Sequence, residues 1–358
     1  MNGSSALPFK VFGALAGALA VGAGLILLTG VSPVSAYLAL FGESFFDYWG
    51  IANSLVKASP LLLAGLAVIV PLRAGLFNIG GEGQIYMGGL FAILIALSMP
   101  DMPGWAGIPA ILIASMAGGA AWAAIPGILR AYKDVNEVIV TLLMNFIGIH
   151  VVSYAVSGPL LAEGAPYPYS EEVPEQVRLP FLLPQSDAHI GFGIGLVIAV
   201  ALAFWLKFMP SGFRLDLVGR NPRAARYAGV NTKRQIVMAM VMGGALAGLA
   251  GGIEVIGLKY RLFHLFSGGY GYDGIVVAFL AALNPLLAPI SALFLAGLSA
   301  GAGMMQRSVG VEASVVEAIQ GLVVLFVAAS LMSKTTAKGK RWLSRFSPRR
   351  ADESDKDD

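Results

Sequence analysis

The sequence predicts an all-α membrane protein that crosses the bilayer several times. Of its 358 residues, 57% are hydrophobic and only 13% are charged, and the mean hydropathy is +0.75. Long apolar stretches recur along nearly the whole chain, and about 20 such residues cross a bilayer as a helix. We therefore expect residues 1–333 to form a single transmembrane domain, followed at 334–358 by a charged, disordered cytoplasmic tail.

The apolar stretches predict about ten transmembrane helices. The first ends at about residue 28 and is too long for the apolar part of a cleaved secretory signal. The others are expected at 51–72, 84–99, 106–129, 136–157, 189–209, 236–258, 273–288, 289–305 and 314–333. Asn284, Pro285 and Pro289 interrupt the eighth and ninth stretches, so a re-entrant segment is an open alternative there.

The distribution of lysine and arginine predicts the orientation in the membrane, because short cytoplasmic loops retain these residues. They gather at 211–235 and after residue 332, so we expect both segments to be cytoplasmic. With an even number of spans, both termini then lie in the cytoplasm. Counting spans places Arg73 on the same side and the acidic loop 159–188 on the outside. The outer connection at 259–264 contains a lysine, an arginine and a histidine, which the rule does not predict.

The stretch from Arg73 to Gly89 interrupts two apolar segments with six glycines and with the polar residues Asn78, Glu82 and Gln84. Each glycine disfavours a helix by roughly 1 kcal/mol relative to alanine, so we expect a broken or unwound segment. Non-helical backbone at membrane depth is tolerated only where protein buries it or where it lines a watery cavity. Because Arg73 is expected on the cytoplasmic side, the stretch is predicted to form an inner gate or the floor of a cavity.

The basic segment 212–235 predicts a short, isolated helix. Asn221 suits the N-cap, Pro222 the first helical position and Gly229 the residue just after the helix. They frame a helix over 223–228, which is too short to be stable in water unless it docks onto something. Its two arginines, three positions apart, share a face that is suited to a partner. The alternative is a basic loop that only fixes the topology.

Several segments resemble one family of transport proteins. The segment 221–231, NPRAARYAGVN, resembles the coupling helix of permease subunits of ATP-binding cassette importers, in the branch of ribose and branched-chain amino acid permeases. The segment 57–89, KASPLLLAGLAVIVPLRAGLFNIGGEGQIYMGG, resembles the nucleoside and simple-sugar permeases of that branch. The blocks DVNEVIVTLLMNFI at 134–147 and GYDGIVVAFLAALNPL at 271–286 extend the resemblance, which covers about residues 51–332.

The resemblance implies a permease that imports nucleosides through the cytoplasmic (inner) membrane of a bacterium. It also implies separate ATPase subunits that hold ATP and magnesium, a second homologous or identical permease chain, and an extracytoplasmic substrate-binding protein. The residues that it assigns to ATPase coupling are Gly219, Asn221, Pro222, Arg223, Ala225, Arg226, Tyr227 and Gly229. The alternatives are a permease for a simple sugar such as ribose and, from another class, a secondary transporter driven by an ion gradient.

Isolated polar residues inside the apolar segments are the candidates for contact with a solute. They are Asn53, Lys57, Asn78, Glu82, Gln84, Asn145, Glu254, Asp273, Asn284, Glu317 and Gln320. An ionisable side chain costs about 2.5–3.5 kcal/mol at the centre of a lipid-facing helix, so these residues should face the bundle interior or lie near helix ends. There they either satisfy broken backbone or contact the solute. We predict that the residues of the pathway or gate are Phe77, Asn78, Glu82, Gln84, Tyr86, Asn145 and Asn284. The aromatic residues Phe77 and Tyr86 could stack on a base or serve only in packing.

Motifs for catalysis are missing from the sequence. It contains no phosphate-binding GxxxxGK[ST] loop, so we expect a transport subunit that neither binds nor hydrolyses ATP. It contains no cysteine, and its three histidines are scattered, so we expect no catalytic residues, no metal site and no cofactor on this chain. No nucleic-acid partner is expected.

Overall fold

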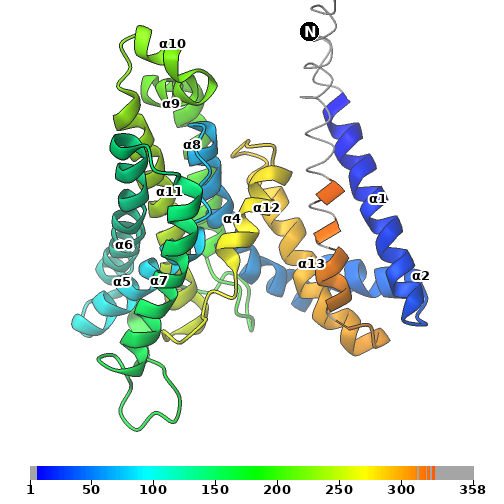
Figure 1. The fold of residues 1–358 in the computed structure, drawn as a ribbon. Helices are drawn as coiled ribbons and strands as arrows, with labels where there is room; N and C mark the ends of the chain where they lie inside the picture. Colours follow the sequence, from blue (N-terminus) through cyan, green and yellow to red (C-terminus); the bar gives the residue numbers. More distant parts are fainter. Residues whose placement is uncertain (1–5, 313, 320, 323–324, 327–358) are drawn as a thin grey trace, which may run out of the picture.

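The computed structural model describes residues 6–312, 314–319, 321–322 and 325–326 (Figure 1). Within these ranges the chain is helical, and its β structure is limited to two isolated bridges. The elements are α1 (Ala6–Leu28), α2 (Pro33–Tyr37), the π-helix η1 (Leu38–Gly42), α3 (Glu43–Phe45), α4 (Tyr48–Arg73), α5 (Gly81–Ser98), α6 (Gly104–Lys133), α7 (Glu137–Ser157), the 3₁₀-helix η2 (Glu175–Val177), α8 (Gly191–Phe208), α9 (Pro210–Arg220), α10 (Pro222–Tyr227), α11 (Thr232–Glu254), the π-helix η3 (Val255–Lys259), α12 (Tyr270–Leu280) and α13 (Ala288–Val309).

Seven helices in the described part of the chain are long and apolar enough to cross a membrane. They are α4, α5, α6, α7, α8, α11 continued by η3, and α13. The segments Ala16–Leu28 and Pro33–Phe45 are apolar but bent by 119° relative to each other, and counted as one span they raise the total to eight. The prediction of an all-α, multi-pass membrane protein is confirmed, whereas ten spans are not.

The predicted eighth span, 273–288, is not a full crossing. Its helix, α12, has 11 residues and is about 16 Å long at 1.5 Å per residue, roughly half of the hydrocarbon core. Turns at 281–287 then separate it from α13, which corresponds to the predicted ninth span. Ten of the twenty positions of the predicted tenth span, 314–333, are described, and these ten are helical. Its other positions and the whole predicted tail, 334–358, lie outside the residues that the structure describes.

Helix α11 lies at the centre of the bundle and contacts α4, α5 and α6. Small residues make this packing possible. A Cβ atom on Gly244 would lie 2.4 Å from the carbonyl oxygen of Gly119 in α6, and one on Gly248 would lie 2.2 Å from that of Ser115. Close backbone approach of this kind is how helices gain packing energy in lipid, where apolar association gives no net advantage.

The predicted break after Arg73 is present but shorter than expected. The backbone is non-helical only at 74–80, and α5 begins at Gly81, so the later glycines of the stretch lie inside a helix. Two of them touch other backbones: a Cβ atom on Gly88 would lie 2.1 Å from the carbonyl oxygen of Gly248, and one on Gly83 would lie 2.9 Å from Met144 O. Tight packing therefore offsets their low helix propensity.

The two ends of the bundle differ in character. Helices α9 and α10 lie together at one end, and the loop that follows α7 lies at the other (Figure 1). Helix α9 was not predicted from the sequence. The loop after α7 packs against the end of η3, where the Val173 N–H donates to Tyr260 O at 2.8 Å and Arg261 Nε donates to Glu172 at 3.1 Å. This pairing of Arg261 gives a physical reason for a basic residue in the connection 259–264, which the positive-inside rule did not predict.

Candidate functional site

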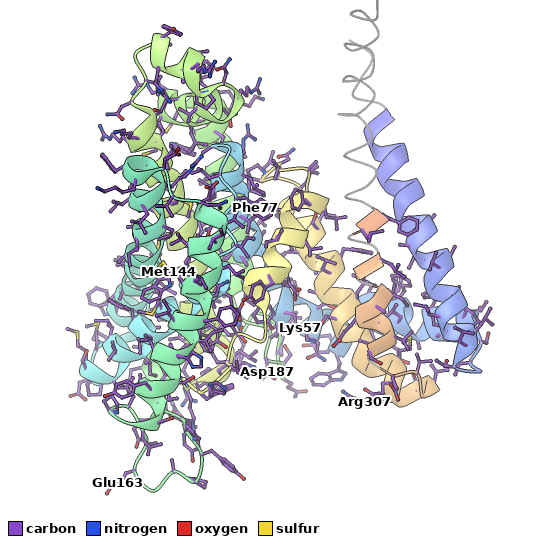
Figure 2. The ribbon with its side chains drawn as sticks, viewed as in Figure 1. Lys57, Phe77, Met144, Glu163, Asp187 and Arg307 are labelled. Carbon is purple, nitrogen blue, oxygen red and sulfur yellow. The ribbon has the colours of Figure 1, made fainter. Side chains whose placement is uncertain are left out.

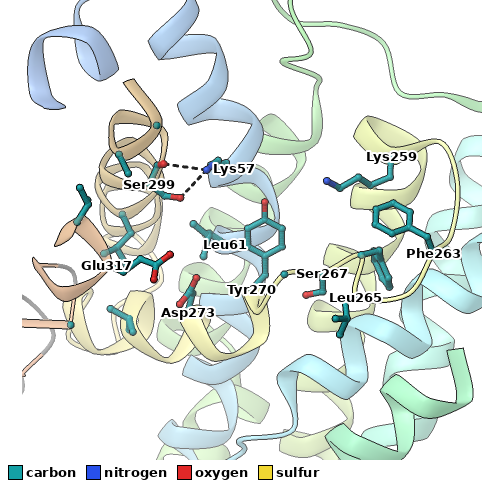
Figure 3. A pocket seen from close by; sticks show the side chains of 18 residues that line it. Lys57, Leu61, Lys259, Phe263, Leu265, Ser267, Tyr270, Asp273, Ser299 and Glu317 are labelled. Atoms are coloured by element: carbon teal, nitrogen blue, oxygen red, sulfur yellow. Dashed lines mark hydrogen bonds between the residues drawn. The ribbon is translucent and has the colours of Figure 1, made fainter. Parts of the chain in front are cut away.

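A cavity of about 850 Å³ opens between α4, α12, α13, the segment that joins η3 to α12, and the helical residues that follow α13, among them Glu317 (Figure 3). Its wall combines charged, hydroxyl and aromatic side chains. They include Lys57, Lys259, Asp273, Glu317, Ser267, Ser299, Phe263, Phe266 and Tyr270. Ligand sites are concave and mostly apolar, with a few convergent polar groups, so this cavity is the best candidate for a solute-binding site.

Lys57 is the charged group that α4 contributes to the cavity. Its ammonium donates hydrogen bonds to Ser299 of α13, at 2.8 Å to Oγ and 3.2 Å to the carbonyl oxygen (Figure 3). Two neutral oxygens satisfy two of its three N–H donors and leave its charge unneutralised. The wall between α4 and α13 therefore presents a positive charge to the cavity.

Lys259 supplies a second positive charge from the last residue of η3. Its Nζ lies 3.7 Å from Oε1 of Glu254, a residue with 0% exposure. A buried carboxylate is costly unless it is paired, so Glu254 and Lys259 stabilise each other at the edge of the cavity. A π-helical segment such as η3 often occurs at functional sites, where it redirects the side chains that follow.

Asp273 and Glu317 point toward each other across the cavity (Figure 3). Asp273 lies in the first turn of α12, where the partial positive charge of the helix N-terminus favours a carboxylate. With Lys57 and Lys259, the lining residues carry two positive and two negative formal charges. Because Glu254 pairs with Lys259, the cavity and its edge together hold three carboxylates and two ammonium groups, so they carry no excess positive charge that would suit an anion. With the aromatic side chains, this set suits a polar solute with a ring face.

The predicted pathway residues Asn78, Gln84 and Asn145 form a buried network that satisfies the break at 74–80. The amides of Asn78 and Gln84 exchange two hydrogen bonds of 3.1 Å, and the Gly80 N–H donates to Asn78 at 2.9 Å. Asn145 accepts from the Gly83 N–H at 2.8 Å and donates to the carbonyl oxygen of Ile79 at 2.9 Å. The structure therefore brings these three residues together, but none of them lines the large cavity.

Glu82 does not line the large cavity, but it holds one of the helices that do. Its carboxylate, only 3% exposed, accepts from the Gly271 N–H at 2.8 Å and from the Gly269 N–H at 3.1 Å. These are backbone groups at the N-terminus of α12, so Glu82 fixes the helix that carries Tyr270 and Asp273. Its neighbour Tyr86 is also buried, and its ring packs against the cavity residue Phe266 with centroids 4.9 Å apart.

The remaining two predicted pathway residues lie away from the cavity. Phe77 packs near Phe279 with ring centroids 6.4 Å apart, and it is closer than Lys57 to the end that carries α9 and α10 (Figure 2). Asn284 is exposed, and its side chain accepts from the Leu286 N–H at 3.0 Å in the turn between α12 and α13. The predicted set thus supports the cavity but omits its lining residues.

The predicted short helix is present as α10 (Pro222–Tyr227), one residue earlier than expected. The Asn221 side chain caps it by accepting from the N–H groups of Arg223 and Ala224, both at 3.1 Å. Gly229 follows with φ of +77°, a conformation that glycine adopts without strain. Ala225 is buried against the protein.

The face of α10 away from the protein is basic and aromatic. Arg223 and Arg226 are exposed, and Tyr227 is 93% exposed. Gly219, which precedes this helix, lies in α9 against the end of α4, where a Cβ atom would be 2.0 Å from Arg73 O. Helix α10 is therefore accessible to a partner and is connected to the spans through α9.

Comparison with known proteins gives a family and several relatives. Residues 50–328 match the family described as branched-chain amino acid transport system / permease component. A guanosine ABC transporter permease of Bacillus subtilis is 36% identical over 90% of this chain and 94% of its own length. A glucose ABC transporter permease of Haloferax volcanii is 35% identical over 87% of this chain and 85% of its own.

A third relative is a nucleoside ABC transporter permease of Lactococcus lactis, 30% identical over 90% of this chain and 89% of its own length. The family match at 50–328 includes the residues of the large cavity and of α10. The matches confirm the resemblance found in the sequence. Subunits of this kind are multi-pass membrane proteins and are not themselves enzymes. The chain belongs to the family of branched-chain amino acid transport system permease components.

Proposed function

We propose that this chain is the membrane-spanning subunit of an ATP-driven importer of nucleosides in the cytoplasmic membrane of a bacterium. The observation that carries the proposal is the similarity, over about nine-tenths of the chain, to relatives named guanosine and nucleoside permeases. The cavity supports it because charged groups of both signs lie there beside Phe263, Phe266 and Tyr270, and a nucleoside is neutral and offers both a ring face and hydroxyl groups.

Import of a simple sugar is the second candidate. The glucose permease of Haloferax volcanii is about as similar to this chain as the guanosine permease is, at 35% against 36% identity. A sugar is also neutral and also forms hydrogen bonds with carboxylates and hydroxyl groups. The aromatic side chains in the cavity favour the nucleoside, because its base can stack on an aromatic ring, whereas the hydroxyl groups of a sugar gain less from an aromatic wall.

The family and the exposed face of α10 support partners of three kinds. ATPase subunits, which hold ATP and magnesium, dock on this helix from the cytoplasm, and a substrate-binding protein delivers the nucleoside at the opposite end. A second permease chain, similar or identical, completes the translocation pathway. The exposed basic surface of Arg223 and Arg226 favours this arrangement over an ion-driven carrier, which has no separate motor to engage.

A chain of contacts connects α10 with the cavity. Helix α10 is joined through Asn221 to α9, and Asp216 of α9 pairs with Arg73 at the end of α4. Arg73 Nη1 also donates to Leu283 O at 3.4 Å, in the turn just after α12. Glu82 holds the other end of α12, so this cavity-lining helix is fixed at both ends. Movement of α9 thus reaches the cavity as a rigid-body displacement of α12, as alternating access requires.

Competition for uptake separates the two candidate substrates. The permease is reconstituted in vesicles with its partner subunits, and uptake of labelled guanosine is measured against an excess of uridine, adenosine, glucose or ribose. We expect strong competition by nucleosides and little by the sugars. Uptake of labelled glucose or ribose under the same conditions, without uptake of labelled guanosine, would support the sugar permease and contradict the nucleoside permease.

A further inference from the structure

A second, smaller cavity of about 360 Å³ lies where α9, the turn after α10 and the start of α11 meet. Its wall includes Ser211 and Arg214 of α9, Asn231 of the turn, and Arg234 and Gln235 of α11. It shares no lining residue with the large cavity. It is therefore a site distinct from the large cavity.

Positive charge dominates this small cavity. Arg214 and Arg234 are exposed, and neither forms an ion pair with any residue that the structure describes. Asp216 is the only acidic residue between positions 191 and 253, and its carboxylate is already paired with Arg73. The N-terminus of α11, a 23-residue helix, adds further partial positive charge. The cavity is therefore suited to an anion.

Gln235 adds an independent indication of a ligand. It lines the cavity and is only 8% exposed, and its side-chain carbonyl has no hydrogen-bond partner within the described part of the chain. Ser211 Oγ accepts from Trp205 Nε1 at 2.8 Å, which leaves the Ser211 hydroxyl hydrogen free to donate. A buried carbonyl without a donor is unfavourable unless a ligand or water completes it. A ligand with a phosphate and a hydroxyl group would satisfy both residues. Its phosphate would accept from the Ser211 hydroxyl, and its hydroxyl group would donate to the Gln235 carbonyl once the amide has rotated toward the cavity.

The surroundings of the cavity indicate where such a ligand comes from. Helix α8 is a membrane-spanning helix that ends at Phe208, and α11 is another that begins at Thr232, so the cavity lies at the ends of two spans. Phe208 and Phe213, close in sequence to Arg214, are 63% and 65% exposed. Exposed aromatic residues beside arginines are typical of a helix at the headgroup level of a bilayer, and basic pockets between spans bind anionic headgroups there.

We propose that this cavity binds the headgroup of an anionic phospholipid such as phosphatidylglycerol. The phosphate lies between the guanidinium groups of Arg214 and Arg234, and a glycerol hydroxyl group donates to Gln235. The lipid then bridges α9 and α11 and holds in place the turn that follows α10. The proposal requires neither a particular substrate nor a particular ATPase, so it stands or falls separately from the proposed function.

Lipid binding to the purified full-length chain tests the proposal. The chain in detergent is titrated with phosphatidylglycerol, phosphatidylcholine or inorganic phosphate, and bound lipid is counted by native mass spectrometry, with thermal unfolding as a second readout. We expect phosphatidylglycerol to bind and to raise the unfolding temperature, and the other two probes to have little effect. Arg214→Gln with Arg234→Gln should weaken phosphatidylglycerol binding roughly 30-fold, because each arginine adds to attraction for an anionic headgroup.

The matched control is Arg223→Gln with Arg226→Gln, which removes two exposed arginines of the same segment outside the cavity. This pair should leave phosphatidylglycerol binding unchanged. Equal weakening by both pairs would show attraction to the basic surface in general and would overturn the site. An equal thermal shift with inorganic phosphate would identify a free-phosphate site and would overturn the lipid assignment. Arg214→Lys with Arg234→Lys keeps the charge and should bind with intermediate affinity, which excludes misfolding as the cause of loss.

Discussion

Arg73 and Asp216 form a two-point ion pair that ties the end of α4 to α9. Arg73 Nε donates to Asp216 Oδ1 at 2.7 Å, and Nη2 donates to Oδ2. The side chains are 26% and 17% exposed, so water screens this pair less than it screens a pair at the surface. Because α9 leads directly into α10 and Arg73 also contacts the turn after α12, this pair lies between the basic helix and the large cavity.

Asp216→Asn should uncouple α9 from the end of α4. The amide cannot accept both guanidinium hydrogen bonds, and it carries no charge to balance Arg73. Coupling free energies between distant sites are typically about 1–3 kcal/mol, so complete loss of this coupling should lower the transport rate by roughly 5- to 150-fold. Transport and ATPase rates are measured in vesicles that contain the full complex. Unchanged transport would remove this pair from the route of coupling.

Arg223→Glu with Arg226→Glu should abolish the stimulation of the ATPase by substrate-loaded binding protein. Both side chains are exposed on α10, so the change reverses the charge of the docking face without altering packing. Lys133→Glu, another exposed basic residue at a helix end, serves as the control and should keep the stimulation. If the α10 variant is stimulated like the wild type, α10 is not the coupling helix.

Glu82→Gln should impair transport and leave the ATPase attached. Its amide accepts one of the two N–H groups at the start of α12 but presents N–H groups of its own to the other, so α12 is less well fixed. An unpaired buried donor costs about 1–3 kcal/mol, enough to reduce the population of the ordered helix. Uptake is compared with co-purification of the ATPase. Glu175→Gln, at an exposed carboxylate, is the control. Wild-type uptake by Glu82→Gln would limit this residue to a structural role.

Asp273→Asn should raise the KM for the transported solute while leaving the maximal rate nearly unchanged. A hydrogen bond to a charged group contributes about 1.5–3 kcal/mol, which corresponds to a change of roughly 10- to 150-fold in KM. Glu312→Gln, an exposed carboxylate outside the cavity, is the control. A fall in the maximal rate with an unchanged KM would place Asp273 in the conformational step instead of the binding step.

Glu172 should make the loop after α7 sensitive to acid. The Arg261 guanidinium, with a smaller contribution from Arg178, holds the pKa of the Glu172 carboxyl below its usual range. A lowered folded-state pKa means that the stabilisation is fully present above the usual carboxyl pKa and is lost as the pH falls through the folded-state pKa.

The Glu172→Gln variant should therefore unfold at a lower temperature than the wild type at neutral pH. In acid, where Glu172 of the wild type is protonated too, the difference should disappear. Thermal unfolding across a pH series measures it, and Glu175→Gln should show no such pH-dependent difference. A constant difference at every pH would exclude the ion pair as its cause.

The sequence predicted the features that depend on local chemistry. Asn221, Pro222 and Gly229 have strong positional preferences, so the short helix was predicted to within one residue. The break after Arg73 was also predicted, but its length was not, because glycine both disfavours helices and permits close packing between them. Propensity describes the first effect, whereas the second depends on which backbone lies opposite, such as Gly248 against Gly88.

The cavity was harder to predict because its walls come from distant parts of the chain. Lys57 and Ser299 are 242 positions apart, and no local pattern pairs them. The expectation that ionisable residues in apolar segments face the bundle interior or lie near helix ends singled out Lys57, Asp273 and Glu317, but it did not predict that they line one cavity. The position at which α12 ends could not be predicted from the sequence either. Ala282 and Leu283 adopt positive φ angles of 50° and 58° there, which alanine and leucine rarely do.

Uptake of labelled guanosine into vesicles that contain the permease with its partner subunits decides whether this chain belongs to an ATP-driven nucleoside importer. We expect uptake that requires ATP on the side of the membrane where the ATPase subunits lie, that other nucleosides compete with, and that is lost when the ATPase subunits are omitted. Uptake that persists without any ATPase subunit and follows a sodium or proton gradient would contradict it.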